Sequence, residues 1–326
     1  MRVKAVLLFS LIAVSSSLIG LSFVYPPLDD LWLENPFWNG LSKVYSRLEP
    51  VRLQDLTGLA ELVAEPSGST VLMLGPSRPF TPDEIVVVNG FLRSGGRVVL
   101  ADEFGTGNSL LEGLDLDVRF SGLLLLDPLF KDRSSRMPRI LNVSSVEVDE
   151  LVLNYPTVLD DADDVAVLAW STFFSYLAVS PGPPDEDSVS GPFPVVAEVG
   201  VGDGSLMLIA DSGLFINSML DRGGNMAFLV SLVEGEVLLD ESHSIPSRLT
   251  MVKAFLIQVS SVLRMTEVRY GLAALSVIAV ARVKWVVDEA EEDEDEVEAV
   301  LRRHPEWDRE LLEELRDARR RARGGR

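Results

Sequence analysis

Four carboxylic residues and one histidine, all able to bind a ligand or take part in catalysis, follow segments of the sequence that are typical of buried strands. They are Asp102, Asp211, Asp240, Glu241 and His243. In open parallel sheets, ligands bind outside the carboxyl ends of the strands, so these side chains would line one crevice if the strand ends are neighbours. Carboxylates with one His can hold a hard divalent cation such as Mg²⁺ or Mn²⁺. An Asp–His pair could also act as a base and the group that orients it.

The same residues also have a structural interpretation. An Asp directly after a strand commonly caps the next helix or accepts hydrogen bonds from loop N–H groups. Asn108, Asn217 and Asn225 are suited to the same work. The sequence favours this structural role over ligand or partner binding at these eight positions. It predicts no catalytic residue and no cofactor, with a divalent cation left open, and metal-assisted hydrolysis by the carboxylates and His243 is the alternative.

The composition excludes several kinds of chemistry. The chain has no cysteine, which removes disulfides, thiolate nucleophiles and cysteine-based metal centres. His243 and His304 are its two histidines, too few for a histidine-rich metal site. The formal net charge of -21 makes nucleic acid an unexpected partner for the main domain.

The elements that must position these residues are predicted between residues 69 and 248. An apolar run at residues 71–74 and another at residues 97–101 predict buried strands. Between them, Thr81 as N-cap, Pro82 at the first position and Glu84 three residues after the cap predict the start of a helix. A strand, a helix and a strand joined by short loops predict a right-handed parallel unit.

The second half of this region repeats the alternation of strands and helices. A strand is predicted at residues 165–170, a β-hairpin at residues 195–210, a helix at residues 225–232 and a last strand at residues 236–239. The stretch at residues 111–146 has no clear period. The expected fold class is therefore α/β, with parallel strands in the sheet.

Apolar segments at both ends predict membrane anchoring. Residues 1–25 contain an almost unbroken apolar run long enough for one span, although a cleaved signal peptide is the alternative. Residues 270–287 form a second, shorter candidate span, interrupted by Arg282 and Lys284, with a buried or amphipathic helix as the alternative. Residues 249–269 have the spacing of an amphipathic juxtamembrane helix.

The basic residues that flank the two spans predict one topology. Arg2 and Lys4 precede the first span, whereas Arg282 and Lys284 interrupt the end of the second. The positive-inside rule then places both termini in the cytoplasm and the α/β domain outside the cell membrane, as a two-pass protein. Residues 26–68 are an aromatic and proline-rich entry segment, and residues 288–326 are a charged cytoplasmic tail, acidic and then basic.

Residues 81–113 and 195–243 together resemble a family of prokaryotic membrane proteins, the domain of unknown function 4350. The motifs that carry the resemblance are Thr81-Pro82-Asp83-Glu84, residues 95–102, Gly107-Asn108, Leu110-Leu111, Asp211, residues 214–217, Asn225, Asp240-Glu241 and His243. The resemblance implies a flavodoxin-like domain of the class I glutamine-amidotransferase type, with a mostly parallel sheet and helices on both faces. It also implies a relation to non-catalytic parts of larger assemblies. True amidotransferases use a Cys nucleophile, which this chain lacks.

Sequence therefore leads to an expected function and an alternative. We expect a non-enzymatic, membrane-anchored extracytoplasmic domain that binds a partner protein or a small ligand, as an accessory of an envelope or transport complex. Its partners would be the lipid bilayer and a protein of unknown identity. The alternative is a metal-assisted hydrolase that uses the carboxylates and His243 at the strand ends.

Overall fold

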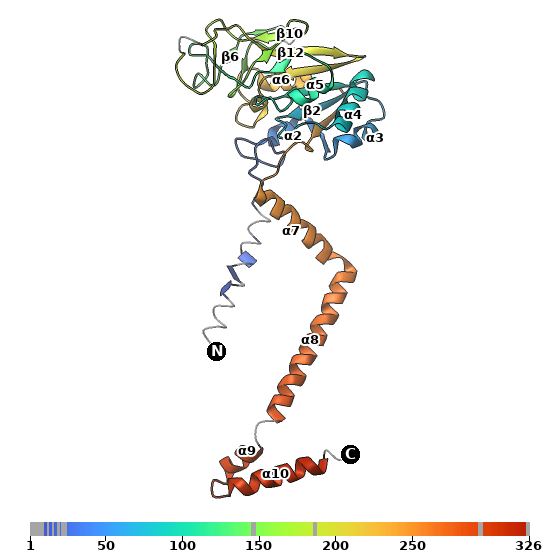
Figure 1. Cartoon of the computed structure of the whole chain (residues 1–326), viewed down its shortest axis with the longest axis vertical. Coiled ribbons are helices and arrows are strands. Elements are labelled where there is room, and N and C mark those ends of the chain that lie inside the picture. The colour runs from blue at the N-terminus through green and yellow to red at the C-terminus, as the bar shows by residue number, and fades with distance from the viewer. Residues whose placement is uncertain are drawn as a thin grey trace. The chain divides into compact units, whose positions relative to one another are not determined.

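The computed structural model of the chain (Figure 1) describes residues 10, 11, 13, 14, 16, 17, 20, 25–144, 148–184, 188–292 and 296–323. The predicted N-terminal span at residues 1–25 lies for the most part outside the described residues. The chain divides into two units, Met1–Ala254 and Phe255–Arg326, and each is described by itself below.

A mixed sheet of eight strands forms the centre of the first unit, within its described residues. In spatial order the strands are β1 (Val51–Leu53), β14 (Glu236–Asp240), β2 (Ser69–Leu74), β3 (Arg97–Ala101), β13 (Gly204–Ile209), β12 (Pro194–Val201), β10 (Ala166–Trp170) and β7 (Asn142–Val143). The first five strands are parallel to one another, and the remaining pairings are antiparallel. The prediction of an α/β domain with a mostly parallel sheet is therefore confirmed.

The central parallel strands are buried on both faces, which is why their sequences are apolar runs without alternation. All six side chains of β2 are buried, and so are four of the five in β3. The predicted hairpin is also confirmed, because β12 and β13 pair from Val196 with Ile209 to Val201 with Gly204.

Short antiparallel pairs occur between β3 and β12, a part of the chain that includes residues 111–146, where the sequence showed no clear period. They are β4 (Arg119–Phe120) with β9 (Leu159–Asp160), β5 (Leu124–Leu126) with β11 (Tyr176–Ala178), and β6 (Arg139–Ile140) with β8 (Leu151–Val152). Strands of two or three residues carry too little period for a sequence pattern to reveal them.

The helices of the first unit include the two that the sequence predicts, after Thr81 and at residues 225–232, and others that it does not. They are α2 (Ser42–Leu48), the 3₁₀ turn η1 (Leu56–Gly58), α3 (Leu59–Leu62), α4 (Pro82–Arg93), α5 (Asn108–Gly113), the 3₁₀ turn η2 (Ser212–Phe215) and α6 (Asn225–Leu232). The predicted capping box is present at α4, where the Thr81 side chain accepts from the Glu84 N–H and the Glu84 carboxylate accepts from the Thr81 N–H.

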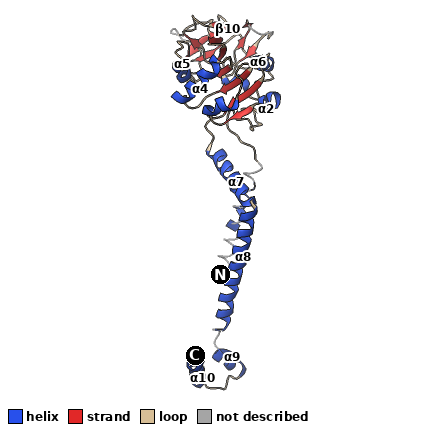
Figure 2. Cartoon of the chain, turned by 90° about the vertical axis from the view of Figure 1, so that its right-hand side faces the viewer, coloured by secondary structure: helices blue, strands red, loops and turns tan. Residues whose placement is uncertain are grey.

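The connections out of β3 and β13 run in opposite directions across the sheet. From β3 the chain goes to the far edge strand β7, whereas from β13 it returns through α6 to β14, on the other side of β2. Helix α4 joins β2 to β3, and α6 joins β13 to β14 in the opposite direction across the sheet. Because such crossovers are right-handed, the two helices lie on opposite faces, and Figure 2 shows them to either side of the strands. The carboxyl ends of β3 and β13 therefore lie at a topological switch point.

The entry segment at residues 26–68 contributes to the same sheet, a point that its composition left open. Its strand β1 pairs with β14, from Val51 opposite Leu238 to Leu53 opposite Asp240. The Leu53 side chain is buried, as are those of Leu56 and Leu59. Residues 26–68 therefore supply an edge strand and part of the core.

Two long helices, α7 (Arg248–Arg264) and α8 (Thr266–Glu292), follow β14. Their boundary at Met265 differs from the boundary at residues 269–270 expected from sequence. Among the described residues, no single helix is both long enough and apolar enough to cross a bilayer. By length and composition alone, α7 with residues 266–282 could cross as a pair, but the two are bent by 77° at the break.

The described part of the tail forms α9 (Glu296–Arg303) and α10 (Arg309–Arg323). Val297 on α9 is buried, at 2% exposure. Within the acidic run, residues 288–292 belong to α8, and residues 293–295 lie outside the described part.

Candidate binding site

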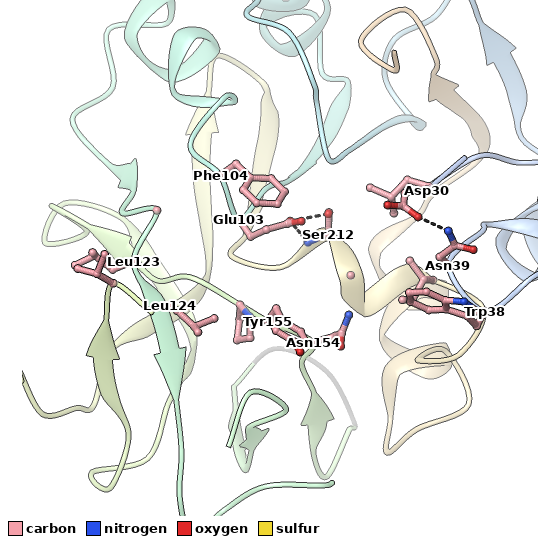
Figure 3. Close-up of a pocket in the computed structure, with 16 residues that line it drawn as sticks. Asp30, Trp38, Asn39, Glu103, Phe104, Leu123, Leu124, Asn154, Tyr155 and Ser212 are labelled. Atoms are coloured by element: carbon pink, nitrogen blue, oxygen red, sulfur yellow. Dashed lines mark hydrogen bonds between the residues drawn. The ribbon is translucent and has the colours of Figure 1, made fainter. Parts of the chain in front are cut away.

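A cavity of about 540 Å³ opens at the switch point, and we call it the strand-end cavity (Figure 3). Its walls come from the loops after β3 and β13, the segment before β9, the adjoining ends of β5 and β11, and the entry segment. The lining residues are Asp30, Leu31, Trp38, Asn39, Glu103, Phe104, Gly122, Leu123, Leu124, Asn154, Tyr155, Pro156, Val179, Ser212, Gly213 and Ile216. The volume lies in the usual range for small-molecule sites.

Glu103 is an ionisable residue in the loop after β3, and it lines this cavity. Its Oε2 accepts hydrogen bonds from the Ser212 backbone N–H at 3.0 Å and from the Ser212 hydroxyl at 2.6 Å (Figure 3). Burial raises the pKa of Glu103, and the nearby Asp102 carboxylate acts in the same direction. Both hydrogen bonds fall on Oε2, and Oε1 accepts none from another described residue.

Gly75, at the end of β2, allows the close approach of the groups around Ser212. It has φ +62, and a Cβ there would lie 3.0 Å from the Ser212 hydroxyl and 2.3 Å from Leu31. A side chain at this position would be strained and would also displace one wall of the cavity.

Asp102 caps the loop that carries Glu103. Its two carboxylate oxygens accept from the N–H groups of Phe104 at 2.9 Å and Gly107 at 2.6 Å, and the residue is fully buried. Burial raises the pKa of Asp102, although these N–H groups act in the opposite direction. The next predicted site residue, Asn108, makes two side-chain hydrogen bonds to the backbone of Phe120.

Asp211 is fully buried behind the loop that follows β13. Its Oδ2 accepts from the Asn154 N–H at 2.6 Å, whereas its Oδ1 makes no hydrogen bond with any described residue. Burial raises the pKa of Asp211 well above its ordinary value, and the nearby charge of Glu103 raises it further. Asp211 therefore positions Asn154 in the cavity wall and does not line the cavity itself.

Asp240 and His243 belong to a separate buried network around the start of α4. The Asp240 Oδ2 lies 2.5 Å from His243 Nδ1, and His243 Nε2 lies 3.5 Å from the Glu84 carboxylate. Glu84 is bonded in turn to Arg78, and the His243 ring stacks on Phe80 with centroids 3.9 Å apart. At 2% exposure, His243 is closed to solvent.

Hydrogen bonds determine the charge of Glu84 in this network. Burial alone would raise its pKa, but hydrogen bonds from Arg78 and Thr81 lower it to about 2. Glu84 is therefore ionised and paired. The Asp–His pair that the sequence suggested does form, but its second ring nitrogen faces this carboxylate.

The remaining predicted residues tie segments together. Glu241 accepts from Arg52 on β1 at 2.8 Å, and burial raises its pKa. The Asn217 amide donates to the carbonyls of Asn35 and Phe37, and its oxygen accepts from the Lys43 N–H. The Asn225 amide bonds both backbone groups of Val152 and the carbonyl of Met219.

The structure thus separates the predicted residues into different environments. Asp102 and Asp211 end neighbouring strands and flank Glu103, whereas Asp240 and His243 lie beyond β2, around α4. In the described part of the chain, no three His, Asp or Glu side chains are placed to hold one metal ion.

Sequence reasoning missed the residues that line the cavity. Glu103 directly follows Asp102, a predicted site residue at the end of a predicted strand, and this position could have identified Glu103 as a site residue. Trp38 and Tyr155 lie far from the strand ends in sequence, and no local pattern could place them together.

The family is shown by comparison with family models. The model for a domain of unknown function, DUF4350, matches residues 34–233, and the chain belongs to this family. The match begins inside the entry segment, in agreement with the place of β1 in the sheet. No curated protein matches the chain.

Solved structures give distant matches. The mmIFT52 N-terminal domain is 15% identical with a TM-score of 0.45, over 59% of this chain and 85% of that one. The β-galactosidase from Bacillus circulans sp. alkalophilus is 15% identical with a TM-score of 0.32, over 50% of this chain and 22% of that one. The exo-β-1,4-mannosidase Op5Man5 from Opitutaceae bacterium strain TAV5 is 10% identical with a TM-score of 0.26, over 50% of this chain and 24% of that one. The chain thus spans under a quarter of the two glycosidases.

Proposed function

We propose that this protein is a non-enzymatic binding domain, tethered to a membrane, which holds a ligand or part of a partner protein in the strand-end cavity. One observation carries the proposal: an open cavity with a half-buried carboxylate, Glu103, and exposed aromatic side chains lies at the switch point of the sheet. Ligands of open α/β sheets bind at this position.

The use made of the predicted site residues supports binding over catalysis. The side chains of Asp102, Asn217 and Asn225 form hydrogen bonds with backbone groups, and His243 is buried between two carboxylates. The hydrolase alternative relied on His243 with the strand-end carboxylates, and His243 is closed to solvent, whereas a general base must reach its substrate.

The exposed apolar surface of the C-terminal helices supports a membrane tether. No side chain of α7 is buried, and Phe255 on α7 and Val277 on α8 are 63% and 70% exposed. Removing each such side chain from water is worth about 1.5–3 kcal/mol, which favours a lipid environment.

Both ends of the first unit leave it at one place, in keeping with two anchors on one membrane. Lys253 on α7 donates to the Tyr25 carbonyl at 2.8 Å, and the Ser247 N–H donates to Asp29 at 3.2 Å. We propose the topology expected from the basic flanks, with the α/β domain outside and the tail in the cytoplasm. The flavodoxin-like, amidotransferase-type comparison and a role in an envelope or transport complex belong to the same proposal.

Site-specific photo-crosslinking in native membranes tests the proposal. A photoreactive phenylalanine replaces Val179 at the mouth of the cavity, and in the matched control it replaces Val86 on α4, which is 70% exposed. We expect a discrete adduct from position 179 and none from position 86. Equal labelling at both positions, or none at 179, would contradict binding at the cavity.

A further inference from the structure

We propose that the strand-end cavity is selective for an organic cation, a protonated amine carried on an apolar or aromatic body. This inference rests on the proposed function and specifies the chemistry of its ligand. It follows from the charges that line the cavity, the hydrogen-bonding atoms left free there, and the aromatic rim.

The charges that line the cavity have one sign. Asp30 and Glu103 are its ionisable carboxylic residues, on opposite sides of the opening in Figure 3. Of the described residues that line the cavity, none is Lys, Arg or His. Arg136 lies against Tyr155, with its guanidinium 5.5 Å from the ring centroid, but it is not a lining residue. The lining itself therefore favours a positive ligand and penalises an anion.

The two carboxylates leave free acceptors in the cavity. The Ser212 hydroxyl donates to Glu103, and the Asn39 amide donates to Asp30 and to the carbonyl of Leu28. Oε1 of Glu103 and the second oxygen of Asp30 accept no hydrogen bond from another described residue. The lining also contains donors, such as the Trp38 indole N–H and the Tyr155 hydroxyl, so it is the carboxylates that select the charge of the ligand. An ammonium group, with three donors and no acceptor, matches both of them.

The rim supplies an apolar and aromatic surface beside these acceptors. Trp38 and Phe104 are 68% and 79% exposed, and Val179 is 92% exposed. Aromatic faces attract cations and pack against apolar groups. A neutral polyol such as a methyl glycoside carries no charge to pair with Asp30 and Glu103.

Calorimetric titration of the full chain in detergent tests the inference with three probes of the same shape. They are 2-phenylethylammonium, neutral 2-phenylethanol and anionic phenylacetate. We expect the cation to bind at least 10-fold more tightly than the other two. We expect Glu103→Gln to remove most of that preference, and the matched surface change Glu112→Gln, on the exposed side of α5, to keep it.

Two further measurements complete the test. Trp38→Ala, at an exposed position that should not affect folding, is expected to weaken the cation several-fold. An N-acetyl-Phe-Lys-amide probe distinguishes the source of the amine, because tighter binding than the free amine indicates a peptide side chain. Equal binding of all three probes, no binding, or tighter binding of a methyl glycoside would overturn the inference. An adduct at position 179 without cation preference would leave the proposed function standing and refute this inference alone.

Discussion

Two buried carboxylates, Glu84 in the first turn of α4 and Asp211 after β13, differ in the charge state that their surroundings favour. Glu84 is stabilised as an anion by Arg78 and Thr81, whereas Asp211 is buried with one oxygen lacking a hydrogen bond. Desolvation opposes ionisation, and hydrogen bonds to the charged form favour it. The two residues should therefore affect stability in opposite directions as the pH changes.

Glu84→Gln should destabilise the fold at neutral pH by about 1–3 kcal/mol, since it removes the negative charge that pairs with Arg78 and weakens the hydrogen bonds that Thr81 donates to this side chain. The pKa of Glu84 is lowered from 4.5 to about 2, so its stabilising effect is present above pH 4.5 and lost as the pH falls toward 2. The cost of the variant should shrink over that window. Chemical denaturation at several pH values measures it, and Asp83→Asn in the same turn, at an exposed position, is the control.

Asp211→Asn should stabilise the fold at pH 8 by roughly 1–3 kcal/mol, because it replaces a buried carboxylate with a neutral amide of the same shape. The pKa of Asp211 is raised above 3.8, so the folded state loses stability as the pH rises above that value. The advantage of the variant should therefore be small at pH 4 and grow with pH. Asp203→Asn in the exposed hairpin turn is the control, and a pH-independent gain in Asp211→Asn would contradict the argument.

At the scale of elements, the entry segment depends on contacts that reach across the chain. Asn217→Ala removes three hydrogen bonds to residues 35, 37 and 43 and should cost about 1–3 kcal/mol. The loss should be local, with faster hydrogen exchange in residues 31–48 than elsewhere. Asn89→Ala on α4, whose side chain accepts from Arg93 alone, is the matched control. Uniform acceleration over the whole sheet would contradict a local role.

At the scale of the whole molecule, the absence of cysteine in the sequence makes the proposed topology directly testable. A single cysteine at the exposed position 203 should react with a membrane-impermeant maleimide in intact cells. A single cysteine at the exposed position 314 should react only after the membrane is permeabilised. The reverse pattern would contradict an external domain, and labelling of both in intact cells would contradict a membrane between them.

Sequence alone determined the parts of this fold that depend on local chemistry. Neighbouring residues suffice to predict the capping box at Thr81, the apolar strands β2 and β3, and the hairpin of β12 and β13. The reason is that caps, turns and burial on both faces each leave a local pattern. The missing cysteine likewise excluded a chemistry without reference to any contact.

Tertiary structure decided which side chains meet. Asp102 and Asp240 look alike in sequence, because each follows or ends an apolar strand. In the structure, Asp102 caps a loop behind the cavity, whereas Asp240 contacts His243, three residues further along the chain. The order of strands, with β2 between β14 and β3, separates these two residues, and strand order depends on contacts between residues that lie far apart in the chain. For the same reason the cavity joins Trp38, Glu103 and Tyr155, which no spacing in the sequence could have brought together.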